Sequence, residues 1–156
     1  MCVPIDATAV ALAKPWLHWL EQNSNIAAME IRELNHVALH VADLDKSSAF
    51  YRDVLRLTSI SRPAFTFPGA WFRLGRNQEL HLIGERFGPV ISRKRGNHFA
   101  LRVDELDSWE AHLKKMGADF RPKKQRPDGA WQVFLHDPDG HVVELFTPSD
   151  SERLSA

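Results

Sequence analysis

Polar and apolar residues alternate in two short stretches that open matching halves of the chain. Asn-His-Val-Ala-Leu-His-Val at residues 35–41 returns 62 positions later as Asn-His-Phe-Ala-Leu-Arg-Val at residues 97–103. Alternation with a period of two is typical of a β-strand that buries one of its faces. A second match, Gly-Ala-Trp at residues 69–71 and 129–131, keeps nearly the same spacing. The pattern therefore predicts one structural unit that is built twice.

Both strands are followed by apolar residues at helical spacing, over residues 43–55 in the first half and 105–116 in the second. Each half then contains three more strand-like stretches: residues 58–61, 70–74 and 79–84, and residues 119–121, 131–136 and 141–146. The predicted fold class is α+β, with two paired βαβββ modules that form a curved, partly closed mixed sheet. The modules span residues 31–86 and 96–148 within one domain of residues 31–150.

The first 30 residues lie outside the repeat. Apolar positions within residues 7–22 are spaced as in an amphipathic helix entered at Pro15. We interpret this extension as a cover for a sheet edge or as the product of a start codon upstream of Met29, with a dimer contact or a lid as the alternative. Residues 151–156 form a C-terminal tail beyond the predicted domain.

Charge is balanced over the 156 residues, with 20 basic and 20 acidic side chains. The chain therefore has no global field that would concentrate nucleic acid or an anionic membrane surface, and a small molecule is the expected partner. No apolar run approaches the roughly 18 residues of a membrane span, and the start lacks the basic segment of a secretory signal. Cys2 is the only cysteine, which excludes an intrachain disulfide. We expect a cytoplasmic protein without nucleic-acid or membrane partners.

Ionisable side chains fall on one face of the predicted strands. Successive side chains of a strand point to opposite faces, and the ionisable residues share one of them. On this face lie His36 and His40 of the first strand, Glu79 and His81 of the last strand of the first half, His98 and Arg102 of the strand that opens the second half, and Glu144 of the last strand. If the two halves pair, His36, His81, His98 and Glu144 line a common cavity. Three imidazoles and a carboxylate are suitable ligands for a divalent metal ion. His40 and Arg102 lie one pleat farther along; they either orient an anionic substrate or form a solvent-facing pair at the pocket mouth.

Four segments of the chain resemble the vicinal-oxygen-chelate superfamily, which includes glyoxalase I, fosfomycin-resistance enzymes, extradiol dioxygenases and bleomycin-binding proteins. They are Leu-Asn-His at residues 34–36, Phe-Tyr-Arg-Asp-Val-Leu at 50–55, Asn-His-Phe-Ala at 97–100 and Asp-Pro-Asp-Gly-His-Val-Val-Glu-Leu at 137–145. The resemblance covers residues 34–148. It implies metal ligands from the first and last strand of each module, which are His36, His81, His98 and Glu144 in this sequence.

The resemblance differs between branches of the superfamily. Bacterial glyoxalase I has a glutamate at the position matching His81, so this chain has one carboxylate fewer at its site. Glu79, two residues earlier on the same face, is the residue that could take the place of that carboxylate. The trio of His36, His98 and Glu144 is similar to that of the fosfomycin-resistance enzymes, and Lys124 resembles a basic residue that holds the phosphonate there. Phe134 stands where those enzymes have a tyrosine, and Ala38 where they have a hydroxyl. Extradiol dioxygenases use a similar trio to bind iron.

From these residues we predict a divalent-metal-dependent lyase or isomerase of the glyoxalase type. It would chelate two adjacent oxygens of a small metabolite and stabilise an enediolate, with Glu144 or Glu79 as the base. Nickel, zinc, manganese and iron remain open as the metal, and glutathione is a candidate co-substrate. The residues expected to bind substrate are His40, Arg102, Lys124 and Phe134. We expect a homodimer, with the cavity built either within one chain or across two; the alternatives are a fosfomycin-type thiol transferase and a non-enzymatic antibiotic-binding protein.

Overall fold

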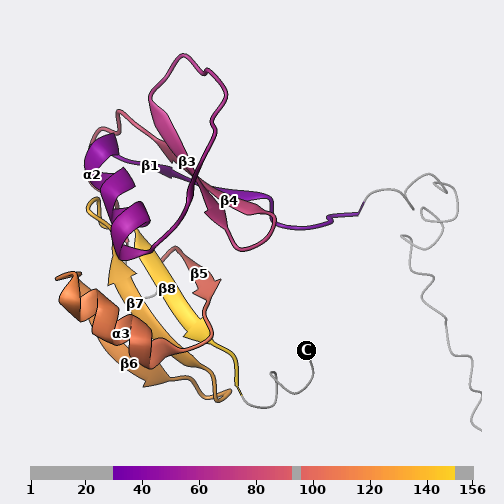
Figure 1. Cartoon of the computed structure of the whole chain (residues 1–156), viewed down its shortest axis with the longest axis vertical. Coiled ribbons are helices and arrows are strands. Elements are labelled where there is room, and N and C mark those ends of the chain that lie inside the picture. Colours follow the sequence, from indigo (N-terminus) through magenta and orange to yellow (C-terminus); the bar gives the residue numbers. More distant parts are fainter. Residues whose placement is uncertain (1–29, 93–95, 150–156) are drawn as a thin grey trace, which may run out of the picture. The chain divides into compact units, whose positions relative to one another are not determined.

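The computed structural model describes residues 30–92 and 96–149, so the predicted helix within residues 7–22 and the tail at 151–156 lie outside the described residues. The chain divides after Glu33, and every described helix and strand belongs to the unit that begins at Leu34 (Figure 1). In chain order the elements are β1 (His36–His40), α2 (Leu44–Ala49), η2 (Phe50–Val54), β2 (Ser59–Ile60), β3 (Gly69–Leu74), β4 (Gln78–Ile83), β5 (His98–Arg102), α3 (Leu106–Lys115), β6 (Phe120–Gln125), β7 (Trp131–His136) and β8 (Val142–Thr147).

The strands form two four-stranded sheets, in the orders β1-β4-β3-β2 and β5-β8-β7-β6. In each sheet the first strand of the repeat pairs in parallel with the last, and the other pairs are antiparallel. We call residues 34–86 module 1 and residues 96–149 module 2. The predicted α+β class with two βαβββ modules is confirmed, and each mixed sheet stays open, with β1 and β5 at sheet edges.

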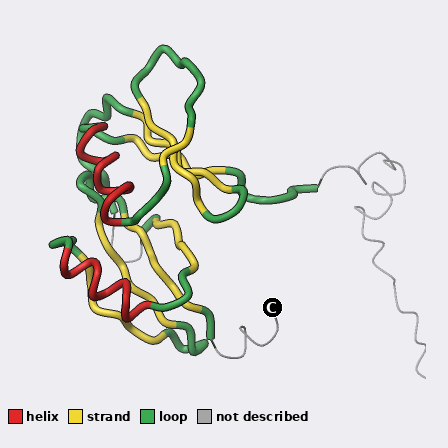
Figure 2. The backbone as a smooth tube through the Cα atoms, viewed as in Figure 1, coloured by secondary structure: helices red, strands yellow, loops and turns green. Residues whose placement is uncertain are grey.

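Each helix packs on the sheet of its own module. Contacts join α2 to β3 and β4, and α3 to β6, β7 and β8, as the red helices beside the yellow strands show in Figure 2. The apolar residues of the central strands fill the space beneath; Leu80, Leu82 and Val143 are fully buried. In the edge strands His36, Ala38 and His40 are exposed while the alternate residues are half-buried, as the alternation predicted. The ionisable face of each sheet is therefore the face away from its helix.

Two local features depart from the sequence prediction. Strand β6 continues through Pro122 to Gln125 instead of ending at residue 121, with a register shift between Arg121 and Lys124. Proline is tolerated there because β6 is an edge strand, and edge strands need no donor on their outer side. The first predicted helix is α-helical only to Ala49 and continues as the π-helical turn η2, whose end is marked by the bond from Leu55 N–H to Phe50 C=O.

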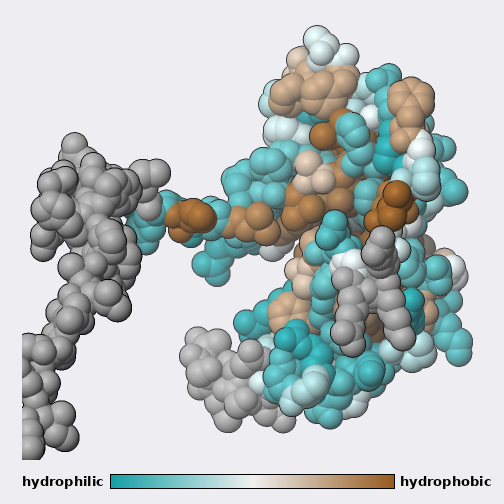
Figure 3. All heavy atoms as spheres, turned by 180° about the vertical axis from the view of Figure 1, so that it is seen from behind, coloured by the Kyte–Doolittle hydropathy of each residue, from teal (hydrophilic) through white to brown (hydrophobic). Residues whose placement is uncertain are grey.

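Several large apolar side chains remain exposed. Phe87 is 95% exposed and Ile91 is 82% exposed, both in the segment between the modules. Figure 3 shows apolar residues in patches among hydrophilic ones on the face that it presents. Among the residues that the structure describes, no helix has the length and apolar character needed to cross a membrane.

The β7–β8 turn at residues 137–140 is held by its first aspartate. Asp137 Oδ1 accepts hydrogen bonds from the N–H groups of Asp139 (2.9 Å) and His141 (2.8 Å). Gly140 has a φ of 94°, which glycine adopts without a steric cost. These bonds hold the Asp137 side chain in place within the turn.

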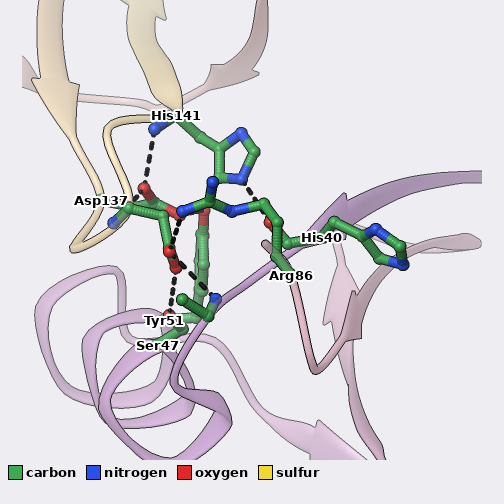
Figure 4. Close-up of polar contacts among 8 residues, drawn as sticks. His40, Ser47, Tyr51, Arg86, Asp137 and His141 are labelled. Atoms are coloured by element: carbon green, nitrogen blue, oxygen red, sulfur yellow. Dashed lines mark hydrogen bonds and ion pairs between the residues drawn. The ribbon is translucent and has the colours of Figure 1, made fainter. Parts of the chain in front are cut away.

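The same turn joins module 2 to module 1 through polar contacts, shown in part in Figure 4. The carboxylate of Asp139 accepts hydrogen bonds from Ala42 N–H (3.0 Å), Ser47 Oγ (3.0 Å) and Arg86 Nη2 (2.6 Å). Burial by itself raises the pKa of Asp139, but these donors and the charge of Arg86 outweigh that effect and hold the pKa below its usual value. We call this set of contacts the junction.

Two further bonds complete the junction. Tyr51 Oη donates to Asp137 Oδ2 at 2.9 Å, and both side chains are buried. Burial, together with the negative charge of Asp137, strongly raises the pKa of the Tyr51 hydroxyl, which therefore stays protonated as a donor. His141 Nε2 donates to the backbone C=O of His40 at 2.9 Å, while the imidazole of His40 points away from the junction (Figure 4).

Candidate metal centre

In module 1 the predicted ligands His36 and His81 belong to a stack of aromatic rings. The imidazole of His81 lies nearly parallel to the indole of Trp71, with ring centroids 3.9 Å apart and an interplanar angle of 6°. Its other face stacks on His36, at 4.3 Å and 16°. The sheet register produces this order, because Trp71 on β3 lies directly opposite His81 on β4, and β4 pairs with β1 on its other side.

His36 and His81 use different ring nitrogens for their hydrogen bonds. His81 Nε2 lies 2.9 Å from Glu79 Oε2; a carboxylate only accepts, so Nε2 carries the proton. His36 Nδ1 lies 2.9 Å from Asn35 Oδ1, an amide oxygen that also accepts. In neutral His36 the proton is therefore on Nδ1, and Nε2 presents its lone pair.

Module 2 brings the predicted ligands His98 and Glu144 together. His98 Nδ1 donates to the backbone C=O of Gly96 at 3.1 Å, so Nε2 of neutral His98 also presents a lone pair. That Nε2 lies 3.0 Å from Glu144 Oε2. The ring of Phe134 packs edge-on against His98 with centroids 5.5 Å apart, and Phe134 lies directly opposite Glu144 in the sheet. Two electron-rich atoms thus face each other, an arrangement that needs a proton or a metal cation between them.

Glu144 has an unsatisfied oxygen in a buried position. The residue is 4% exposed, and its Oε1 has no hydrogen-bond partner. A buried carboxylate oxygen without a donor costs free energy unless a cation compensates it. The donor set of imidazole Nε2 atoms and a carboxylate therefore fits a divalent metal ion of the kind predicted from the sequence.

The four predicted ligands form two separate pairs, one in each module. Within residues 30–92 and 96–149, no group of three or more His, Cys, Asp or Glu side chains could hold a metal ion together. Glu79, the second predicted base, lies with the module 1 pair through its bond to His81, and its side chain is 24% exposed. Within the described residues of one chain, neither pair of predicted ligands is large enough to hold a metal ion by itself.

Two of the predicted substrate-binding residues lie beside His98. A pocket of about 640 Å³ on module 2 is lined in part by Lys124 and Phe134 together with His98. Arg121 and His136 also line it, so the pocket is basic. Arg121 was missed from the sequence because the strand was expected to end there, although the proximity of Lys124 in the chain was a usable signal.

Arg102 and His40 lie elsewhere. Arg102 borders a second pocket, of about 920 Å³, whose lining comes from both modules and is mostly apolar, with Val37, Phe99 and Leu101 among its residues. His40 is exposed on β1, and its ring points away from the junction (Figure 4). The structure therefore separates these two from the pocket that contains Lys124 and Phe134.

Comparison with known proteins gives a family match over most of the domain. The model of the Glyoxalase/Bleomycin resistance protein/Dioxygenase superfamily matches residues 33–145. Glyoxylase I 4 of Arabidopsis thaliana is 30% identical over 125 residues, which cover 75% of this chain and 71% of that protein. Metallothiol transferase FosB of Shouchella clausii is 28% identical over 137 residues, covering 80% of this chain and 86% of that protein.

A solved structure with the same fold contains a metal. A mutant of the fosfomycin resistance protein FosX from Listeria monocytogenes, complexed with Mn(II) and a dihydroxypropylphosphonic acid, has a TM-score of 0.64 to this chain at 22% identity. The match covers 81% of this chain and 100% of that one. At this identity the likeness establishes the fold.

Proposed function

Because this chain belongs to the Glyoxalase/Bleomycin resistance protein/Dioxygenase superfamily, we propose that it is a divalent-metal-dependent lyase or isomerase of the glyoxalase type. Its substrate is a small molecule with two adjacent oxygens. His36, His98 and Glu144 hold the metal. When bound, the metal supplies electrostatic stabilisation for negative charge that develops on those two oxygens.

One observation carries this proposal: the buried carboxylate of Glu144 has an unpartnered Oε1, and its Oε2 lies 3.0 Å from His98 Nε2. A purely structural glutamate at 4% exposure would normally have both oxygens satisfied by donors. The Nδ1 atoms of His36 and His98 are both held by oxygen acceptors, and metal-bound histidines are usually oriented in this way.

Glu79 is the better candidate for the base. Glu144 is needed as a ligand and is almost fully buried, whereas the side chain of Glu79 is 24% exposed and can meet a substrate. The carboxylate of Glu79 is oriented by the N–H of His81, which keeps one of its oxygens in a fixed position. In this role Glu79 accepts the proton from the carbon next to the polarised carbonyl.

We propose that the site is completed by a second copy of the chain. The two pairs of ligands lie in different modules, and the described residues bring no three of the ligands together. Strands β1 and β5, which carry His36 and His98, are sheet edges whose outer sides are available for pairing. The exposed Phe87 and Ile91 add apolar surface that a partner would cover. A homodimer with module 1 of one copy against module 2 of the other would satisfy all three features.

Metal content tests the proposal. Metal-free protein is reconstituted separately with Mn²⁺, Zn²⁺, Ni²⁺ and Fe²⁺, and bound metal per chain is measured by elemental analysis. We expect near-stoichiometric metal in the wild type and its loss in Glu144→Ala. Glu85→Gln, which changes an exposed glutamate, is the matched control and should keep the metal. A wild type that binds none of the four ions contradicts the proposal and leaves a small-molecule-binding protein.

A second candidate, thiol transfer to a phosphonate, is favoured by the basic pocket beside His98. Arg121 and Lys124 line it and would hold a dianionic phosphonate. The metal-loaded protein is assayed with fosfomycin plus glutathione or cysteine, and with an α-ketoaldehyde plus glutathione. Turnover of only the ketoaldehyde adduct supports the glyoxalase-type reaction, and turnover of only fosfomycin supports the transferase.

A further inference from the structure

His81 differs from the other two histidines of the proposed site in the nitrogen that it has available. In His36 and His98 the hydrogen-bonded nitrogen is Nδ1, at 2.9 Å from Asn35 Oδ1 and 3.1 Å from Gly96 C=O. In His81 it is Nε2, at 2.9 Å from Glu79 Oε2. Coordination through Nε2 of His81 would therefore require its bond to Glu79 to break and its proton to leave.

Both faces of the His81 ring are also covered. Trp71 lies 3.9 Å away on one side at an angle of 6°, and His36 lies 4.3 Å away on the other at 16°. The side chain is 14% exposed. A ring held between two parallel rings and fixed at its edge by a carboxylate has little freedom to turn toward an ion. The His81 ring nevertheless constrains the orientation of the His36 ring that stacks on it.

Building on the proposed function, we infer that His81 is a positioning residue and not a metal ligand. The ring of His81 packs between Trp71 and His36 and so limits how far the His36 ring can tilt. The hydrogen bond to Glu79 prevents the His81 ring from rotating within the stack. The orientation of His36 Nε2 is thereby set by two contacts, the Asn35 side chain at one edge and the His81 ring on one face. Metal binding then depends on the flat shape of residue 81 and not on its nitrogen atoms.

This separation of shape from coordination can be tested with two substitutions. His81→Phe keeps a flat ring and removes every ligand atom, whereas His81→Ala removes both. His36→Ala is the reference for the loss of a true ligand. Zn²⁺ affinity of the full-length protein is measured by competition with a chromophoric chelator, and the absorption spectrum of the Co²⁺-loaded protein reports on the ligand set.

We expect His81→Phe to keep Zn²⁺ affinity within about 3-fold of wild type and to leave the Co²⁺ spectrum unchanged. His81→Ala should weaken affinity by about 10- to 100-fold, as loss of an orienting group does. If His81→Phe loses the metal as completely as His36→Ala, His81 is a ligand and the inference is wrong. It is equally wrong if His81→Ala binds Zn²⁺ as tightly as wild type.

A second measurement separates this inference from the metal hypothesis itself. In metal-free protein with ¹³C-labelled histidine, the ring signal of His36 is identified by its absence in His36→Ala. The signal should shift or broaden in His81→Ala and stay sharp in His81→Phe. If the wild type binds no metal but the signal behaves in this way, the proposed function fails while the positioning role stands. An unchanged signal in His81→Ala refutes the positioning role.

Discussion

The two modules share a fold but differ in what they place at matching points. On the last strand, module 1 has His81 and module 2 has Glu144; on the neighbouring strand, Trp71 lies opposite His81 and Phe134 lies opposite Glu144. Module 1 thus stacks aromatic rings around its histidine, and module 2 buries a carboxylate with an unpartnered oxygen. In the proposed metal site, module 1 would supply a histidine oriented by this stack and module 2 would supply the negative charge.

The largest effect on metal binding is expected when the residue of module 2 that matches His81 is also made a histidine. Glu144→His removes the only carboxylate of the proposed ligand set and puts an imidazole into a position that is 4% exposed. We expect metal binding to fall at least about 100-fold, to or below the limit of calorimetric titration with Mn²⁺ or Zn²⁺. Glu85→Gln should titrate like wild type, and tight binding by Glu144→His would mean that the modules do not differ in this way.

The turns that precede the last strands differ as well. The β7–β8 turn carries Asp139, with its three donors from module 1, whereas the β3–β4 turn at residues 75–77 is exposed. Asp139→Ala leaves the half-buried Arg86 without its carboxylate and should lower the free energy of unfolding by about 3–5 kcal/mol. Urea denaturation measures this. Asn77→Ala in the exposed turn is the matched control, with an expected change within about 0.5 kcal/mol.

A smaller effect is expected at a matching pair in the helical segments. Tyr51 in module 1 and Leu113 in module 2 occupy equivalent positions in the repeat, and both are fully buried. Only Tyr51 carries a hydroxyl, which donates to Asp137. Tyr51→Phe should therefore lower the free energy of unfolding by about 1.5–3 kcal/mol, the range for a hydrogen bond to a charged group. The same denaturation experiment would find no change if the junction did not depend on this bond.

The smallest effect is a pH dependence that Asp139 of module 2 contributes. The pKa of Asp139 is lower in the folded protein than in the unfolded chain, so its stabilisation is complete above the unfolded pKa of about 3.9. That stabilisation is lost as the pH falls through the lower, folded pKa. The difference in unfolding free energy between wild type and Asp139→Asn should therefore shrink below about pH 4. A constant difference from pH 3 to pH 7 would show that Asp139 does not titrate differently on folding.

The sequence predicted what depends on local pattern, and missed what depends on register. The repeat of residues 35–41 at 97–103 was enough to identify two modules and the ionisable face of each sheet. It could not show that Trp71 lies opposite His81, because that pairing depends on where the β3–β4 hairpin turns. Arg86 and Asp139 are 53 residues apart in the chain, and no local rule joins them. The strand predicted at residues 119–121 continues through Pro122 because β6 lies at a sheet edge, which is a property of the whole fold.

The division of ligands between modules also has a genetic consequence. If each site takes His36 from one copy and Glu144 from the other, a chain lacking only His36 and a chain lacking only Glu144 are each inactive alone. Mixed in equal amounts, they would form hybrid dimers in half of the assemblies, each with one intact site. About a quarter of the wild-type sites would then be restored, as two-fold symmetry and random pairing dictate. Two defective alleles could thus complement each other within a single cell.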